Sequence, residues 1–253
     1  MARLPIEVIE TIVDFLRHDR EALKRCCLAS KSLIARTRSH LFKRVSFLKP
    51  TDIQAWKEFF PDPAKTPAIF TTHLEIIRES VAGKDFSSWI RATFINVVAL
   101  EVRAGAWSYQ GAFAPFHNLL PHVKSLTMGW NFMESQEVFD FICSFPSLEN
   151  LKVYGAGGLL GTTGGPLSLP KLTGTISFRC YWGGEFIHRF LKLSGDLRSR
   201  EIVVNIVTVG AGGLSKELVK RCSGTLERIV IEASEDTPSK SRPHSPAHNR
   251  LRI

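Results

Sequence analysis

The hydrophobic residues follow two different spacings in the two parts of the chain. Over residues 3–17 apolar positions recur at spacings of three and four, with Ile9 and Leu16 on one stripe, which is typical of an amphipathic helix. Asp19 is a suitable N-cap for a second helix, and a third is expected to begin near Ser30. Three helices of this length enclose a very small core, so we expect them to need a partner.

From about residue 45 the pattern changes to short segments that are typical of β-strands and share the motif apolar-x-x-Leu-x-Leu. Their central positions are Leu74, Leu100, Leu126, Leu151, Ile176, Ile202 and Ile229, spaced 26, 26, 25, 25, 26 and 27 residues apart. Helical patterns lie between some of the runs, for example over residues 135–143. A period of this length lies within the range of leucine-rich repeats, whose strands line one face of a solenoid. The sequence therefore predicts an α/β fold with about six to seven degenerate repeats.

Composition shifts mark the expected boundaries. Residues 233–253 are rich in Ser, Pro and charge, so they cannot offset the entropy of ordering and are expected to be disordered. We expect a helical module over residues 1–47, a linker with the first repeat elements over 48–72, the repeat domain over 73–232 and a basic tail over 233–253.

The positive charge is unevenly distributed. The chain carries a net charge of +9, of which +6 lies in residues 1–50, +1 in residues 51–233 and +2 in the tail. A nucleic-acid-binding domain usually presents a broad basic face, which the nearly neutral large domain does not provide. Nucleic acid is therefore an unlikely partner, and the basic N-terminal module is compatible with an acidic protein partner.

No segment resembles a membrane span or a secretion signal. The chain lacks a run of roughly 18 to 20 apolar residues, and Met1 to Asp14 has no apolar core of the kind found in signal peptides. A cytoplasmic or nuclear protein without membrane contact is expected.

Catalytic and metal-binding patterns are also missing from the sequence. The five cysteines show no CxxC or Cys/His ligand spacing, so neither a metal site nor a cofactor is predicted. The glycines from Gly155 to Gly161 do not match a phosphate-binding loop, and no GxSxG elbow is present. We expect no catalytic residues and no enzymatic activity of the chain itself.

Residues 4–47 resemble an F-box. The resemblance rests on the opening Leu-Pro, the acidic and apolar first helix, the Leu-x-x-Cys-x-x-Leu-Ala-Ser-Lys-Ser-Leu run from Leu23 to Leu33, and the closing Leu-Phe-x-x-Val from Leu41 to Val45. Together with the period, the chain resembles the F-box/leucine-rich-repeat families of fungi. The implied fold is an N-terminal three-helix F-box followed by a degenerate leucine-rich-repeat solenoid.

The resemblance implies a non-catalytic subunit of a ubiquitin ligase. In such proteins the F-box helices dock on a Skp-family adaptor that leads to a cullin–RING ligase, and the repeats bind a protein substrate. The implied adaptor-facing residues are Leu4, Pro5, Ile9, Ile12, Leu16, Leu23, Leu28 and Leu33. Many F-boxes have Trp where this chain has Leu33, and the smaller side chain is expected to weaken docking by about one to two kcal/mol.

Two alternatives remain open at this point. Apart from the resemblance, the helices are equally suited to cap a repeat stack, in which case the protein is an interaction scaffold without ligase function. A set of aromatic residues follows successive strands and forms either a substrate surface or part of the core on the loop side. These residues are Trp107, Tyr109, Trp130, Phe132, Tyr154, Tyr181 and Trp182.

Overall fold

The computed structural model describes residues 5–77, 85–103, 113–130, 133–155, 159–160, 169–180, 184–194, 197–206, 211–233 and 249–252. The chain opens with three helices, α1 (Ile6–Phe15), α2 (Arg20–Ala29) and α3 (Ile34–Leu41), with a 3₁₀ turn, η1 (Lys31–Leu33), before α3. Asp19 caps α2 as expected, because its carboxylate accepts a 2.9 Å hydrogen bond from the backbone N–H of Ala22.

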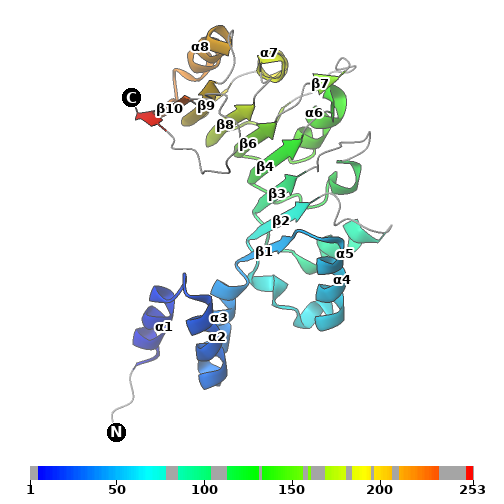
Figure 1. Cartoon of the computed structure of the whole chain (residues 1–253), viewed down its shortest axis with the longest axis vertical. Coiled ribbons are helices and arrows are strands. Elements are labelled where there is room, and N and C mark those ends of the chain that lie inside the picture. Colours follow the sequence, from blue (N-terminus) through cyan, green and yellow to red (C-terminus); the bar gives the residue numbers. More distant parts are fainter. Residues whose placement is uncertain are drawn as a thin grey trace, which may run out of the picture.

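A single large sheet follows, and its strands lie in the order in which they occur along the chain (Figure 1). The strands are β1 (Arg44–Phe47), β2 (His73–Ile77), β3 (Ala99–Arg103), β4 (Ser125–Trp130), β6 (Asn150–Gly155), β8 (Thr175–Cys180), β9 (Glu201–Ile206), β10 (Arg228–Ala233) and β11 (Asn249–Arg252). All neighbouring strands pair in parallel except β10 and β11, which are antiparallel. A separate short parallel pair is formed by β5 (Met133–Glu134) and β7 (Leu159–Leu160).

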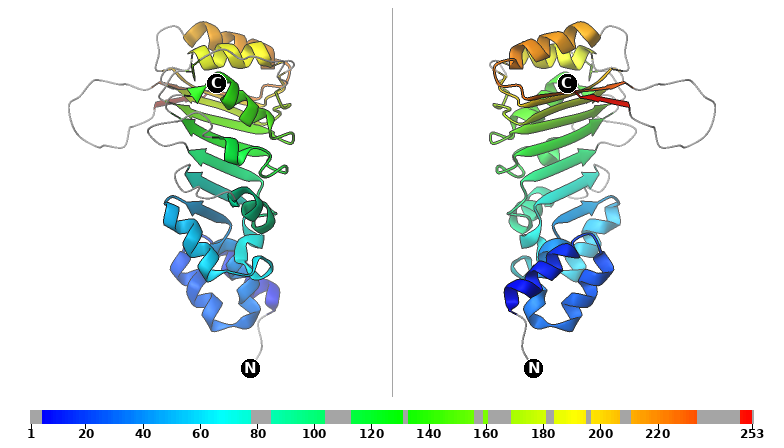
Figure 2. Two further views of the ribbon diagram at one scale, coloured as in Figure 1. Left: turned by 90° about the vertical axis from the view of Figure 1, so that its right-hand side faces the viewer. Right: turned by 90° about the vertical axis from the view of Figure 1, so that its left-hand side faces the viewer.

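The connecting helices cover one face of this sheet. They are α4 (Pro50–Phe59), α5 (Phe86–Thr93), α6 (Ser135–Cys143), α7 (Gly184–Leu193) and α8 (Ala211–Cys222), with the 3₁₀ turns η2 (Pro63–Lys65), η3 (Pro67–Phe70) and η5 (Ala114–Phe116). Figure 1 shows α4, α5 and α6 on the same side of the strands, and Figure 2 shows the strands stacked upward from the N-terminal helices. Among the described residues, no connecting helix lies on the other face of the sheet.

The core lies between the sheet and these helices and is rich in phenylalanine. Alternate strand residues point into it, so that Leu100 and Val102 of β3 are buried while Arg103 is exposed. Near β1, Phe47 lies edge-on to Trp56 of α4 and to Phe94, with ring centroids 5.8 Å apart in both cases.

The periodic alignment of the strands is confirmed. The seven central positions from Leu74 to Ile229 occupy one continuous register across the parallel strands, each beside the next. Six of them are buried, and Ile229 in β10 is half-buried.

The fold class expected from the sequence, a three-helix F-box followed by a leucine-rich-repeat solenoid of six to seven repeats, is wrong. The structure is an α/β fold on one sheet of eight parallel strands and a final antiparallel strand, although the α/β class itself is correct. The sheet begins with β1 inside residues 1–47, because Val45 and Phe47 alternate with exposed neighbours and pair with β2. A regular period reveals recurring strands, but it does not show where their sheet begins or ends.

The C-terminal end also differs from the expected disordered tail. Residues 249–252 form β11, with Leu251 beside Ile231 of β10, while residues 234–248 lie outside the described residues. An unpaired edge strand offers free backbone groups, and β11 pairs with those of β10.

Among the helices that the structure describes, none is long and apolar enough to span a bilayer.

Candidate functional site

The first helix carries an apolar stripe that faces solvent. Val8, Ile12 and Phe15 follow one another at spacings of four and three, so they lie on one side of α1. Their exposed fractions are 43%, 49% and 83%. A phenylalanine exposed to this degree contributes little to folding, and an apolar row on one helix face is a frequent docking surface for a partner.

A second large apolar side chain is exposed on the neighbouring helix. Leu28, near the C-terminal end of α2, is 87% exposed. We call Val8, Ile12, Phe15 and Leu28 the exposed apolar set of the N-terminal helices.

The opposite side of α1 is held against the other two helices. Val13 of α1, Leu23 of α2 and Thr37 of α3 are buried. The Thr37 hydroxyl donates a 2.7 Å hydrogen bond to the backbone oxygen of Leu33 and lies 2.8 Å from the thiol of Cys27. These contacts form the small core of the N-terminal helices and leave the exposed apolar set on the outside.

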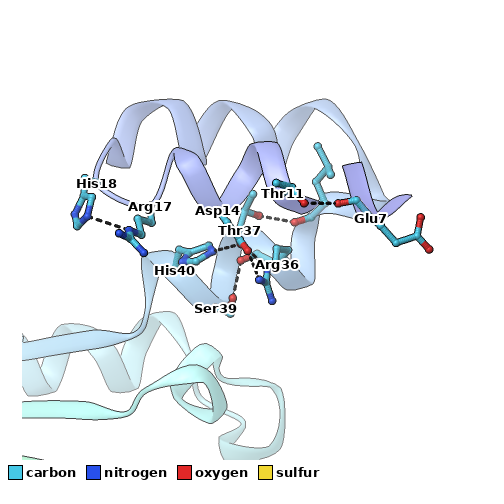
Figure 3. A network of polar contacts seen from close by, with 10 residues as sticks. Glu7, Thr11, Asp14, Arg17, His18, Arg36, Thr37, Ser39 and His40 are labelled. Atoms are coloured by element: carbon cyan, nitrogen blue, oxygen red, sulfur yellow. Dashed lines mark hydrogen bonds and ion pairs between the residues drawn. The ribbon is translucent and has the colours of Figure 1, made fainter. Parts of the chain in front are cut away.

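A polar network joins α1 to α3 (Figure 3). The Arg36 guanidinium donates to both carboxylate oxygens of Asp14, with an Nε–Oδ1 distance of 2.6 Å, and Nε2 of His40 lies 2.8 Å from Oδ1. These hydrogen bonds, first from Arg36 and then from His40, hold the pKa of Asp14 well below its usual range. The same ion pair raises the pKa of Arg36. The two-point contact fixes the orientation of α1 on α3.

Stability should depend on pH through this carboxylate. The pKa of Asp14 is lower in the folded than in the unfolded chain. The ionised carboxylate therefore stabilises the fold fully above about pH 4, and this stabilisation is lost as the pH falls toward the folded pKa. Arg36→Met is therefore expected to flatten the fall in urea midpoint between pH 5 and pH 2. Arg17→Met, which removes an exposed arginine that donates a 3.1 Å hydrogen bond to His18, serves as the control and should keep the wild-type slope. Equal slopes in all three proteins would contradict this assignment.

The structure separates the predicted adaptor-facing residues into three groups. Pro5, Ile12 and Leu28 are exposed, and Ile9, Leu16 and Leu33 are half-buried. Leu23 is fully buried among the helices, so it supports the surface and is not part of it. Leu4 lies outside the described residues.

Phe15 and Val8 were missed by the sequence reasoning. Ile9 and Leu16 on the predicted stripe are half-buried, whereas Val8, Ile12 and Phe15 are more exposed. The spacing of Val8, Ile12 and Phe15 was a usable signal, because it fits the same helical period.

Two residues of the predicted aromatic patch, Tyr154 and Trp130, lie within the described part of the chain. Tyr154 is exposed at the end of β6, with the guanidinium carbon of Arg179 5.7 Å from its ring centroid. Trp130 ends β4, and the position of its side chain is not described. Trp107, Tyr109, Phe132, Tyr181 and Trp182 lie outside the described residues.

The described residues also form a mostly apolar cavity of about 350 Å³ beside α5. It is lined by Arg91, Ile95, Val97, Asn118, Leu120, Pro121 and His122. The guanidinium of Arg91 donates a 3.0 Å hydrogen bond to the backbone oxygen of Asn118, which adopts a positive φ of 52°.

Within the described ranges, no group of three or more His, Cys, Asp or Glu side chains is placed to hold a metal ion.

The exposed apolar set, held in place by the Asp14 network, is the best-defined candidate interaction site. Comparison of the chain with protein-family models, curated proteins and solved structures gives no match.

Proposed function

We propose that this chain is the substrate-recognition subunit of a Skp–cullin–F-box ubiquitin ligase, with no catalytic activity of its own. The observation that carries the proposal is the exposed apolar set on helices whose sequence resembles an F-box. Phe15 and Leu28 are almost completely exposed, while the same helices are joined tightly on their inner side. Such a surface is suited to burial by an adaptor of the Skp family.

In this proposal the chain acts as a bridge. The N-terminal helices bind the adaptor, which leads to a cullin–RING ligase, and the sheet domain holds a protein target. Holding the target close raises its effective concentration near the ubiquitin-charged enzyme. The working compartment is then the cytoplasm, the nucleus or both.

A scaffold without ligase function is the second candidate. It is supported by the contact between α3 and η3 and by the continuation of α3 into β1, which place the helices at the β1 end of the sheet. Helices that serve only as a cap need an apolar face toward the sheet. They do not need an exposed row on the far side of α1, so we prefer the adaptor-binding proposal.

The direct test is co-expression of the full chain with a Skp-family adaptor. We expect a stable one-to-one complex on size-exclusion chromatography, and a ternary complex when the N-terminal domain of a cullin is added. The adaptor passed over the same affinity resin without the chain is the control. A wild-type chain that is folded but captures no adaptor would rule out the ligase proposal and leave the scaffold.

A further inference from the structure

The parallel strands all begin at one edge of the sheet, which we call the entry edge. The loops that lead into β2, β3, β4 and β6 lie wholly within the described residues. The backbone oxygen of Thr72 accepts two 3.0 Å hydrogen bonds, from the N–H groups of Val98 and Ala99. The backbone oxygen of Val98 in turn accepts bonds of 2.8 and 3.0 Å from Lys124 and Ser125. The entry edge is therefore one continuous surface from β2 to β4.

The cavity beside α5, which we call the α5 cavity, lies in this edge between the loops that lead into β3 and β4. Two of its lining residues, Val97 and Leu120, are buried, and two others, Ile95 and Pro121, are exposed. Its apolar wall therefore runs from the core to the surface. Its volume of about 350 Å³ lies near the lower end of the range for ligand sites, which suits one large side chain.

The polar residues around the α5 cavity bring positive charge and no negative charge. Arg91, Asn118 and His122 line it and are exposed, and no carboxylate is among the lining residues. Arg91 gives an N–H of its guanidinium to the backbone oxygen of Asn118, and it forms no ion pair within the described residues. A guanidinium has five N–H groups, so Arg91 keeps donors for a carboxylate.

Exposed apolar side chains continue beyond the α5 cavity along the entry edge. Ile69, Ile95 and Val98 are 44%, 57% and 39% exposed. The side-chain amide of Asn96 donates a 2.7 Å hydrogen bond to the backbone oxygen of Ile69, which joins η3 to the loop that leads into β3. Apolar side chains gathered on neighbouring loops are typical of an interaction surface.

We propose that the α5 cavity binds a short extended segment of a target protein, in which a large apolar side chain is followed two residues later by a carboxylate. The inference rests on the proposed function, since it names the class of target that the sheet domain would hold. The apolar side chain would fill the cavity, and the carboxylate would pair with Arg91. In an extended chain these two side chains point to the same side, so both face the cavity.

The charges on the neighbouring loop favour a peptide over a nucleic acid. A nucleic-acid backbone needs a row of available cations to neutralise successive phosphates. Lys124, on the loop that leads into β4, lies 2.9 Å from Glu149 and is already paired. Arg91 beside an apolar cavity is suited to one carboxylate next to one apolar group.

The test titrates the isotope-labelled full chain with the acetylated and amidated peptide Gly-Ser-Phe-Ser-Glu-Ser-Gly. Nuclear magnetic resonance follows the backbone amides at an ionic strength of about 0.01 M, where screening is weak. We expect saturable shifts centred on Val97, Leu120 and His122. Glutamine in place of the glutamate should weaken binding at least about fivefold, and serine in place of the phenylalanine should abolish it.

Two variants test the protein side of the contact. Arg91→Glu should weaken binding of the peptide at least about tenfold, and it should bind the peptide with lysine in place of glutamate more tightly than the wild type does. Ile95→Asp should also weaken binding at least about tenfold. Both residues are exposed, so the fold should be unaffected. Lys192→Glu changes an exposed charge on α7, and it should shift the affinity by less than about twofold.

Three results would overturn the proposal. They are equal binding of the glutamate and glutamine peptides by the wild type, an equal loss of affinity in Lys192→Glu, or binding of free phenylpropionate as tight as that of the peptide. The last result would assign the cavity to a small carboxylic acid. The assay needs no adaptor, so its outcome and that of the adaptor test are separate. Peptide binding by a chain that captures no adaptor would refute the ligase proposal alone, and adaptor capture with no peptide binding would refute this inference alone.

Discussion

Replacing Phe15 by aspartate is expected to weaken binding of a Skp-family adaptor by at least about a hundredfold. The ring is 83% exposed in the free chain, so a partner that covers the exposed apolar set would bury nearly all of it. An aspartate at that position would bring an unpaired carboxylate into an apolar contact, which costs several kcal/mol. Isothermal titration of the full chain with the purified adaptor measures the change.

The matched control is Phe59→Asp. Phe59 ends α4, is 79% exposed and lies on the sheet domain, far along the chain from α1. Phe59→Asp should leave adaptor affinity unchanged, and neither substitution should change the free energy of unfolding by more than about 0.5 kcal/mol. Equal losses of affinity in the two variants, or an unchanged affinity in Phe15→Asp, would show that this surface does not bind the adaptor.

Phe47→Ala is expected to lower the free energy of unfolding by about 3–5 kcal/mol. The side chain is buried where β1 meets α4 and α5, and its ring contacts Trp56, Trp89 and Phe94 at centroid distances of 5.8, 6.1 and 5.8 Å. Alanine removes the shared partner of all three rings and leaves a cavity in the core. Urea unfolding followed by tryptophan fluorescence reports on the same cluster.

Phe59→Ala serves as the control for this second prediction. It removes the same atoms from an exposed position, so the expected change is within about 0.5 kcal/mol. A loss below about 1 kcal/mol in Phe47→Ala would contradict the conclusion that β1 belongs to the core of the sheet. Phe47→Leu should fall between the two alanine variants, because it refills part of the cavity.

The strands were the most predictable part of the fold. Their apolar residues alternate and recur with a nearly constant period, and both features are local in sequence. β1 was assigned to the helical module because it is only four residues long and lies 29 residues before its register partner, with α4 and two 3₁₀ turns between them. β11 was missed because its ordering comes from the edge of β10 and not from its own composition.

The candidate site was only partly predictable. Helical periodicity shows that α1 has an apolar side, but it does not show which residues pack against α3 and which stay exposed. Leu23 of α2 was predicted to face the adaptor and is buried, whereas Phe15 of α1, for which no role was predicted, is exposed. The contacts of Asp14 with Arg36 and His40 join residues 22 and 26 positions apart, and they depend on how α1 crosses α3.

The sequential order of the parallel strands has a consequence for the growing chain. Each of these strands pairs with one that lies about 25 to 29 residues further along, so no strand waits for a partner made much later. During synthesis α1, α2 and α3 emerge before the strands, and each new parallel strand extends an already formed edge. The nascent protein can therefore complete its helical surface before the middle of the sheet exists, and it exposes one unfinished edge at a time.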